Sequence, residues 1–440
     1  PDDFIAIVKA YHPVIKQADI SIKKASAEIT IARGNFDPSL YLNSEQKTFD
    51  GKNYYQYTNS ELKIPTWYGI EVKAGLENNG GQFINSESSL GQTSYLGISV
   101  PLAKNLVMDK RRAILQQAKL FKSLSEAERL NTLNDLLNDA YATYWNWVKE
   151  YQLYNVVTNT VEVNEVRFNL VKIGYRQGDR PAIDTVEALV QLQTFQYLQS
   201  ESLVKLQNAG IDLSNFLWLP NNSFYQLSLA VQPAGFWFEQ SIEALPLAVL
   251  DELLYIAKLT HPKLSMFDFK LDMLEVERKL KFQQLLPEIN AKANILNRDF
   301  NPLKNAAIPL LENNNRWGIA VKVPLFFRQG RGEYRIAKLK LEENGLFFKQ
   351  KIIETENKIK NYYNLVAILQ LQIATANSAL INYNTLLKNE LLRFSNGESS
   401  LFLVNTRENK LLEIKQKIIE LEMKLMKAGY YLSWSAGRLN

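Results

Sequence analysis

Two kinds of hydrophobic periodicity alternate along the chain, and the longer one is helical. Between Leu102 and Ile173 there is no glycine or proline, and apolar residues recur at steps of three and four, from Ile114 through Leu137 to Val148. At 1.5 Å per residue such a segment reaches roughly 100 Å, whereas helices of globular proteins average about 11–12 residues. The pattern therefore predicts an unusually long helix.

Each long helix is predicted to fold back on a second one. The first reaches a glycine-containing turn at 174–181 and continues as a helix over 182–209. A second long helix over 346–396 precedes another over 398–428. A helix, a short turn and a second helix make an antiparallel helical hairpin. Taken alone, each hairpin also fits an ordinary coiled coil.

The second periodicity has period two and predicts strands with one apolar and one polar face. Every second residue is apolar in four stretches: Ile70 to Leu76, Leu96 to Val100, Ile289 to Ile295, and Trp317 to Val323. At about nine residues each, they have the length that a tilted strand needs to cross a bilayer. No run of about 18 uninterrupted apolar residues occurs, so a transmembrane helix is not expected. Long thin helices are poorly suited to cover a sheet, which favours a membrane sheet over a soluble one.

The strands are too few for one chain to close a barrel. The first β region, 39–100, is longer than the second, 288–323, and fits four strands at about 39–48, 55–64, 69–77 and 93–101. The smallest natural membrane barrels use about eight strands, and open edges in lipid leave backbone groups unsatisfied. A membrane barrel therefore predicts a cyclic oligomer. The extra strands of the first region could alternatively form an extracellular flap.

The order helix, strands, long helix, turn, helix occurs twice. We expect a first repeat at 1–218, a linker at 219–250 that is part of an equatorial region, and a second repeat at 251–440. The linker is rich in proline, glycine and asparagine breakers. The motifs shared by the two repeats are His12-Pro13 and His261-Pro262 at a helix start, Val100-Pro101-Leu102 and Val323-Pro324-Leu325 after the strands, and a basic cluster next to each tripeptide.

Composition excludes several classes of function. The 440 residues carry a net charge of +5 from 51 basic and 46 acidic side chains, too little for a dedicated nucleic-acid binder. The absence of cysteine excludes disulfides and thiol nucleophiles. Both histidines lie in His-Pro pairs, where helix entry explains them better than metal binding. Gly330-Arg331-Gly332 lacks the Gly-Lys-Ser/Thr ending of a phosphate loop. We expect no catalytic residue, metal or cofactor.

The repeated order of elements resembles the TolC-type family of outer-membrane efflux proteins. The resemblance implies a mostly α fold with a membrane β part, in which three copies share a β-barrel and a long helical barrel. It implies a passive exit duct in the outer membrane of a Gram-negative bacterium, extending into the periplasm, for efflux or type I secretion. The implied partners are two further copies, outer-membrane lipid, a periplasmic adaptor protein and an inner-membrane pump. A soluble periplasmic coiled-coil scaffold or adaptor is the alternative.

The two helical turns are the best functional candidates under this resemblance. Arg167-Phe168, Gly174, Gly178 and Asp184 are similar to the family's tip turn, and the resemblance implies that tip charges hold the aperture closed or contact the adaptor. Ordinary turn chemistry is the alternative for each residue. The candidates are Arg176, Gly178, Asp179, Arg180 and Asp184 at the first turn, and Arg393, Asn396, Gly397, Glu398 and Ser399 at the second.

The second turn departs from the family pattern. Leu403 stands six residues after Gly397, where the pattern places an Asp, and Ser399 occupies the position at which some members have a gating Arg. Two further candidates are aromatic: Trp67 and Trp317 are expected at the membrane interface, where such rings are enriched. Trp145 and Trp147, which lie in the middle of a helix, are expected to pack against other helices.

Overall fold

The computed structural model describes residues 1–228, 230–234, 247–300 and 314–439. The predicted linker therefore lies partly outside the described residues. The first half contains α1 (Asp2–Tyr11), α2 (Pro13–Gly34), β1 (Ser39–Phe49), β2 (Lys52–Pro65), β3 (Glu71–Gly80), β4 (Gly91–Pro101), α3 (Lys110–Gln177) and α4 (Ala182–Ser214). The second half contains α5 (Leu247–Thr260), α6 (Pro262–Phe282), η1 (Gln283–Leu285), β5 (Glu288–Arg298), β6 (Asn315–Lys322), α8 (Arg328–Ser395) and α9 (Leu401–Ser435).

The chain divides into two compact units, and each draws on both predicted repeats. One unit comprises Ser21–Glu126 and Met266–Lys349, which hold all six strands. The other comprises Pro1–Ile20, Ala127–Ser265 and Gln350–Asn440, which hold the helical turns. The boundaries of the two sequence repeats and of their linker stay a prediction.

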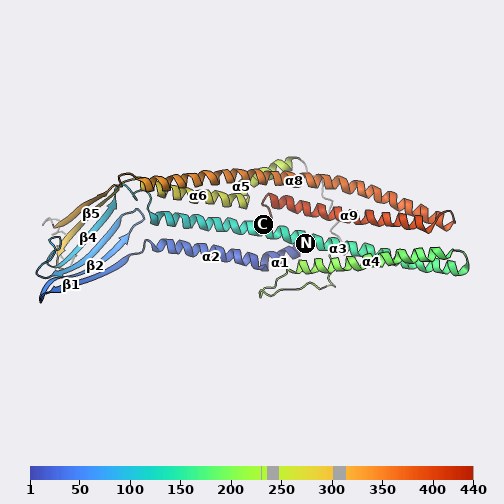
Figure 1. Ribbon diagram of the computed structural model, residues 1–440, viewed down its shortest axis with the longest axis horizontal. Helices are drawn as coiled ribbons and strands as arrows, with labels where there is room; N and C mark the ends of the chain where they lie inside the picture. Colours follow the sequence, from blue (N-terminus) through green and yellow to red (C-terminus); the bar gives the residue numbers. More distant parts are fainter. Residues whose placement is uncertain (229, 235–246, 301–313, 440) are drawn as a thin grey trace. The chain divides into compact units, whose positions relative to one another are not determined.

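The strands form one antiparallel sheet in sequence order, β1-β2-β3-β4-β5-β6. Four of them occupy the first β region, and their bounds confirm the predicted division within about three residues. The helices α2, α3, α6 and α8 all join the sheet at the same end (Figure 1). Among the described residues, β1 and β6 are the edge strands, and each has one neighbour.

The helical unit is built from two long hairpins, α3–α4 and α8–α9, as the sequence predicts (Figure 1). Both α3 and α8 have 68 residues. Aromatic rings pack between the hairpins: Tyr141 stacks on Tyr430 at 3.7 Å between ring centroids. Trp145 and Trp147 are 2% and 5% exposed in the adjoining core, which confirms the expected packing.

One helix carries an apolar stretch that the sequence reading underestimated. In the described part of the chain, α8 contains an 18-residue window with a mean hydropathy of 1.4, apolar and long enough to cross a membrane, and little of it is buried. The cause is that residues 361–387 include no charged side chain, although polar residues interrupt every apolar run. A single window of this kind is weak support for a membrane helix. Exposed Leu365, Ile368 and Leu371 instead make a stripe at helical spacing.

The two His-Pro pairs begin α2 and α6 by the same contact. The His12 Nδ1 atom accepts a hydrogen bond from the Val14 N–H at 3.3 Å, and the His261 Nδ1 accepts one from the Lys263 N–H at 3.1 Å. Each imidazole thus acts as an N-cap, which satisfies one of the free N–H groups of the first turn. Burial, then the nearby Lys263 charge, lower the pKa of His261 to about 4. The cap therefore uses the neutral ring.

This cap makes stability depend on pH. Because the folded pKa lies below the usual 6.5, the contribution of His261 is fully present above about pH 6.5 and is lost as the pH falls towards 4. The full span corresponds to about 3 kcal/mol of unfolding free energy. His261→Asn keeps an N-cap acceptor without a titrating ring. We expect its thermal unfolding midpoint to fall less between pH 7.5 and 5 than that of the parent; equal falls would contradict the assignment.

Candidate channel wall and tip

Apolar and charged side chains lie on opposite faces of the sheet, except next to the β1–β2 turn. One face carries Leu62, Ala74, Leu96 and Ile295 directly opposite one another on β2 to β5, and the next row is Ile64, Val72, Ile98, Ala293 and Trp317. Twelve charged strand residues lie on the other face: Glu45, Lys47, Glu61, Lys63, Glu71, Lys73, Glu77, Glu288, Lys292, Arg298, Arg316 and Lys322. The remaining charged strand residue, Lys52, adjoins the β1–β2 turn beyond a register shift. We call these the apolar face and the polar face.

The apolar face is uncovered. Trp317 is 74% exposed, and Leu96, Ile98, Ile319 and Val321 are between 47% and 61% exposed. A contiguous apolar surface of this kind in water marks a site that contacts protein or membrane. Strands with alternating faces and a charge-free outer band are typical of barrels that meet lipid on the outside and water on the inside.

The polar face is organised by ion pairs between strands. Lys63 Nζ lies 2.9 Å from Glu71 Oε2, and Lys73 Nζ lies 3.2 Å from Glu61 Oε1. The Tyr95 hydroxyl donates to the second oxygen of Glu61 at 2.7 Å. Its ring passes directly over Gly75, where any Cβ would collide with it. These pairs order the side chains without a covering layer, as expected of a face that lines water.

The junction between strands and helices accounts for the first basic cluster. Asp109 accepts a hydrogen bond from the Arg112 N–H at 2.8 Å and so caps α3. The Arg111 Nη1 atom lies 3.0 Å from the Glu71 carboxylate on β3, which fixes the helix to the sheet. Gly330 lies in the first turn of α8, and a Cβ there would meet the Gln284 carbonyl oxygen at 2.5 Å. Close packing at an elbow therefore explains this glycine.

The two predicted interfacial tryptophans have different surroundings. Trp67 lies in the turn between β2 and β3 and stacks on Phe36 at 4.2 Å between centroids. Trp317 projects from the apolar face of β6. Their position at a membrane interface stays a prediction.

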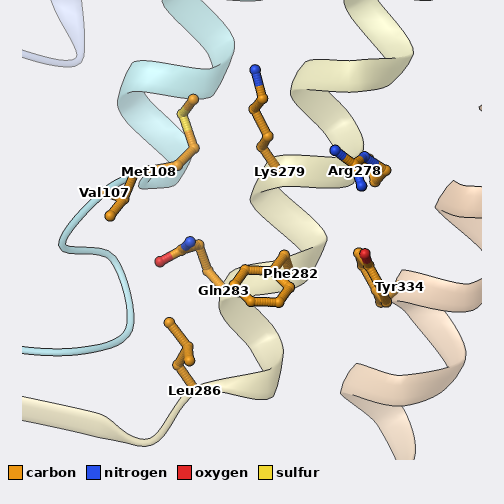
Figure 2. Close-up of a pocket in the computed structure, with 8 residues that line it drawn as sticks. All are labelled: Val107, Met108, Arg278, Lys279, Phe282, Gln283, Leu286 and Tyr334. Atoms are coloured by element: carbon orange, nitrogen blue, oxygen red, sulfur yellow. The ribbon is translucent and has the colours of Figure 1, made fainter.

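An open apolar pocket of about 420 Å³ lies beside the same junction (Figure 2). Its walls come from the segment before α3, the end of α6, η1 with the residue after it, and the start of α8: Val107, Met108, Arg278, Lys279, Phe282, Gln283, Leu286 and Tyr334. The rings of Phe282 and Tyr334 meet edge to face, with centroids 5.7 Å apart. The Arg278 guanidinium pairs with the Glu275 carboxylate at 2.7 Å. The lining offers apolar contact and no acid–base pair.

Both helical turns use one backbone motif. At the first turn Gly178 has φ +83°, its N–H donates to the Tyr175 carbonyl, and the Asp179 N–H donates to the Gly174 carbonyl. At the second turn Gly397 has φ +78°. Its N–H donates to the Phe394 carbonyl, and the Glu398 N–H donates to the Arg393 carbonyl, so both hydrogen bonds of the first turn recur. This is the Schellman ending, in which glycine takes the left-handed conformation at low cost. Turn chemistry thus explains both glycines.

The predicted tip residues divide into bonded and exposed groups. Arg180 stacks on the Phe394 ring at 3.8 Å and lies 3.8 Å from Asp184, so it connects the first turn to the second. The Ser399 hydroxyl donates to Glu390 at 2.5 Å. The Arg393 guanidinium lies 4.0 Å from the same carboxylate. Four others are exposed at the turns: Arg176, Asp179, Asn396 and Glu398.

A buried ion pair joins the two hairpins close to the tip. The Arg167 guanidinium forms two hydrogen bonds with the Glu408 carboxylate, at 2.6 and 2.9 Å, and their side chains are 14% and 8% exposed. Two polar contacts accompany it between α4 and α9, from Gln191 to Asn409 at 2.8 Å and from Asn405 to Glu187 at 3.3 Å. Sequence reasoning noted Arg167 but missed Glu408, Glu390 and Phe394. Glu408 and Phe394 lie more than 200 residues from their partners Arg167 and Arg180, and Glu390 belongs to no motif, so no local pattern indicated them.

Comparison with known proteins identifies the fold. No protein-family model and no curated protein matches the sequence. The structure resembles the CmeC outer membrane channel of Campylobacter jejuni, with a TM-score of 0.67, 14% identity, and coverage of 99% of this chain and 85% of that one. It also resembles the outer membrane protein VceC of Vibrio cholerae, with a TM-score of 0.68, 14% identity, and coverage of 99% of this chain and 95% of that one. For the open state of the MtrE outer membrane channel of Neisseria gonorrhoeae, the TM-score is 0.64 and the identity 13%, with coverage of 100% of this chain and 89% of that one.

The class that these comparisons define is the fold of TolC-type outer-membrane channels, as the sequence resemblance predicts. These similar structures are channels or outer-membrane proteins rather than enzymes. Among the described residues no group of three or more His, Cys, Asp or Glu side chains is placed to hold a metal ion.

The two faces of β6 allow a matched test. Ile319 lies on the apolar face and Ala320 on the polar face of the same strand. We expect Ile319→Lys to destabilise the membrane-inserted protein by about 2–4 kcal/mol, because a lysine would enter lipid. Ala320→Lys should be tolerated. Unfolding by denaturant from lipid vesicles measures both, and similar effects at the two positions would show that neither face meets lipid.

Proposed function

We propose that the chain is one subunit of a passive outer-membrane channel for efflux or secretion. The observation that carries this proposal is the charge-free apolar band that crosses all six described strands at the sheet end that joins the helices, with the ion pairs between described strands on the opposite face. Lipid satisfies the first face and water the second. A soluble coiled-coil scaffold, the second candidate, is favoured by the long hairpins alone and leaves this face without a partner.

The open sheet supports a homo-oligomer, and the channel fold supports three copies. Among the described residues β1 and β6 each have a neighbouring strand on one side only, and lipid cannot satisfy the backbone groups that a sheet edge leaves unpaired. Pairing with neighbouring copies closes the wall without adding another protein. The apolar stripe of α8, at Leu365, Ile368 and Leu371, suits contact with the same neighbours. This places the subunit in the outer membrane of a Gram-negative bacterium, with its helices in the periplasm.

The tip is proposed as the closable end, which receives cargo through a periplasmic adaptor from an inner-membrane pump. The buried Arg167–Glu408 pair and the Arg180–Phe394 contact hold the two hairpins of one chain together. Opening an aperture formed by several copies requires hairpins to move apart, so these contacts favour the closed state. The exposed tip residues, among them Arg176 and Asp179, remain accessible to an adaptor.

Planar-bilayer recording tests this function. The purified protein should require detergent and should produce discrete conductance steps. Arg167→Ala should raise the open fraction, because removing one partner of a buried pair costs about 3–5 kcal/mol, enough to shift a two-state balance more than about a hundredfold. Lys410→Ala, which removes an exposed pair with Glu413 on the same helix, is the control and should leave the open fraction unchanged.

Two results would count against the proposal. A protein that is soluble without detergent and gives no conductance excludes the channel. Conductance that is equal in the parent, Arg167→Ala and Lys410→Ala keeps the channel but removes this ion pair from its closure.

A further inference from the structure

The sheet contains one hairpin more than the family resemblance implies. Two repeats with one strand hairpin each account for four strands, which match β3–β4 and β5–β6. The additional hairpin is β1–β2, residues 39–65, and it pairs along β3 from Gln56–Gly80 to Pro65–Glu71. It either continues the membrane wall or stands outside it as a flap.

The additional hairpin obeys the same division of charge as the rest of the sheet. Its apolar side chains Leu40, Leu42, Leu62 and Ile64 fall on the apolar face, and Leu40 and Leu42 are 75% and 73% exposed. Its charged side chains away from the β1–β2 turn fall on the polar face: Glu45, Lys47, Glu61 and Lys63. A flap with water on both sides has no physical reason to exclude charge from one side.

The hairpin is also continuous with its neighbours on both faces. Leu40, Leu62, Ala74 and Leu96 lie directly opposite one another from β1 to β4, so the apolar rows extend into it without a gap. On the polar face two ion pairs, Lys63–Glu71 and Lys73–Glu61, bind it to β3. Between Leu42 and the β1–β2 turn, the same face of β1 carries uncharged polar side chains. The apolar band is therefore limited to the sheet end that joins the helices.

We propose that the β1–β2 hairpin belongs to the membrane wall, so that β1, rather than β3, pairs with β6 of the neighbouring copy. The inference rests on the proposed channel function and concerns how its wall closes. Strands alternate in direction across the six-stranded sheet, so β6 and the next copy's β1 meet antiparallel. Apolar residues are even-numbered in β1 and odd-numbered in β6, and Ser39 and Lys322 lie at the same sheet end. We propose the register in which Ser39 of one copy pairs with Lys322 of the next, which places Leu42 opposite Ile319.

The proposal sets the width of the barrel. Six strands from each of three copies make eighteen, whereas four from each make twelve. With strands about 4.8 Å apart and tilted by about 40°, eighteen strands give a barrel roughly 36 Å across between backbones, and twelve give roughly 24 Å. Barrels of 16–18 strands enclose an aqueous channel. The additional hairpin thus widens the membrane part of the duct.

Disulfide cross-linking of the full chain tests which strand is the edge, and the chain contributes no cysteine of its own. The double variant Leu42→Cys/Ile319→Cys should form covalent dimers and trimers, because opposite residues of antiparallel strands lie within disulfide distance. Tyr41→Cys/Ile319→Cys places the thiols on opposite faces and is the control. Ala74→Cys/Ile319→Cys reports the flap arrangement, in which β3 would be the edge.

The outcomes separate this inference from the proposed function. Cross-linking through Leu42 and not through Ala74 supports the wider wall. Cross-linking through Ala74 overturns it and retains a shared barrel, whereas a protein that stays monomeric with every pair overturns both. Labelling in vesicles with a water-soluble maleimide provides a second readout: Tyr41→Cys should react and Leu42→Cys should be protected. Equal reaction at both positions would identify the hairpin as a flap.

Discussion

The backbone hydrogen bonds of the sheet impose the constraint on which the proposed assembly depends. A sheet in lipid cannot leave an edge unpaired, because no water is present to bond its N–H and C=O groups. This chain has a six-stranded sheet with two edges and a charge-free face. The apolar face makes the sheet unsuited to water, and the edges make a single copy unsuited to lipid. The proposed assembly of copies resolves both conflicts, so oligomerisation and membrane insertion are expected to occur together.

The helical part depends on a few contacts of a different kind. Schellman endings at Gly178 and Gly397 reverse the two long helices without side-chain caps. Between the hairpins, the stack of Tyr141 on Tyr430 is an aromatic contact, whereas the Arg167–Glu408 pair is a discrete polar contact close to the turns. A buried pair is costly to break from one side but contributes little net stability. It is therefore suited to favouring one arrangement of hairpins over another.

Much of the fold could be predicted from local sequence, because long helices and alternating strands leave periodic patterns. The four strands of 39–101 and both turns follow from such patterns. The contacts between distant segments do not: Glu408 lies 241 residues from Arg167, and no local signal pairs them. The apolar stretch of α8 was underestimated because glutamine and asparagine interrupt it while no charge does. The proposed contacts of Trp67 with a membrane and of the tip charges with an adaptor involve partners outside the chain, so no pattern within the sequence predicts their geometry.

We propose that several copies of this two-faced sheet close into one hollow wall. Electron microscopy of the detergent-purified protein tests it most directly, because strand number and symmetry are visible in the same reconstruction. The account predicts a threefold particle with an open lumen, in which each copy contributes six strands to a single barrel. A solid particle, or a monomer whose sheet stays open, would contradict it.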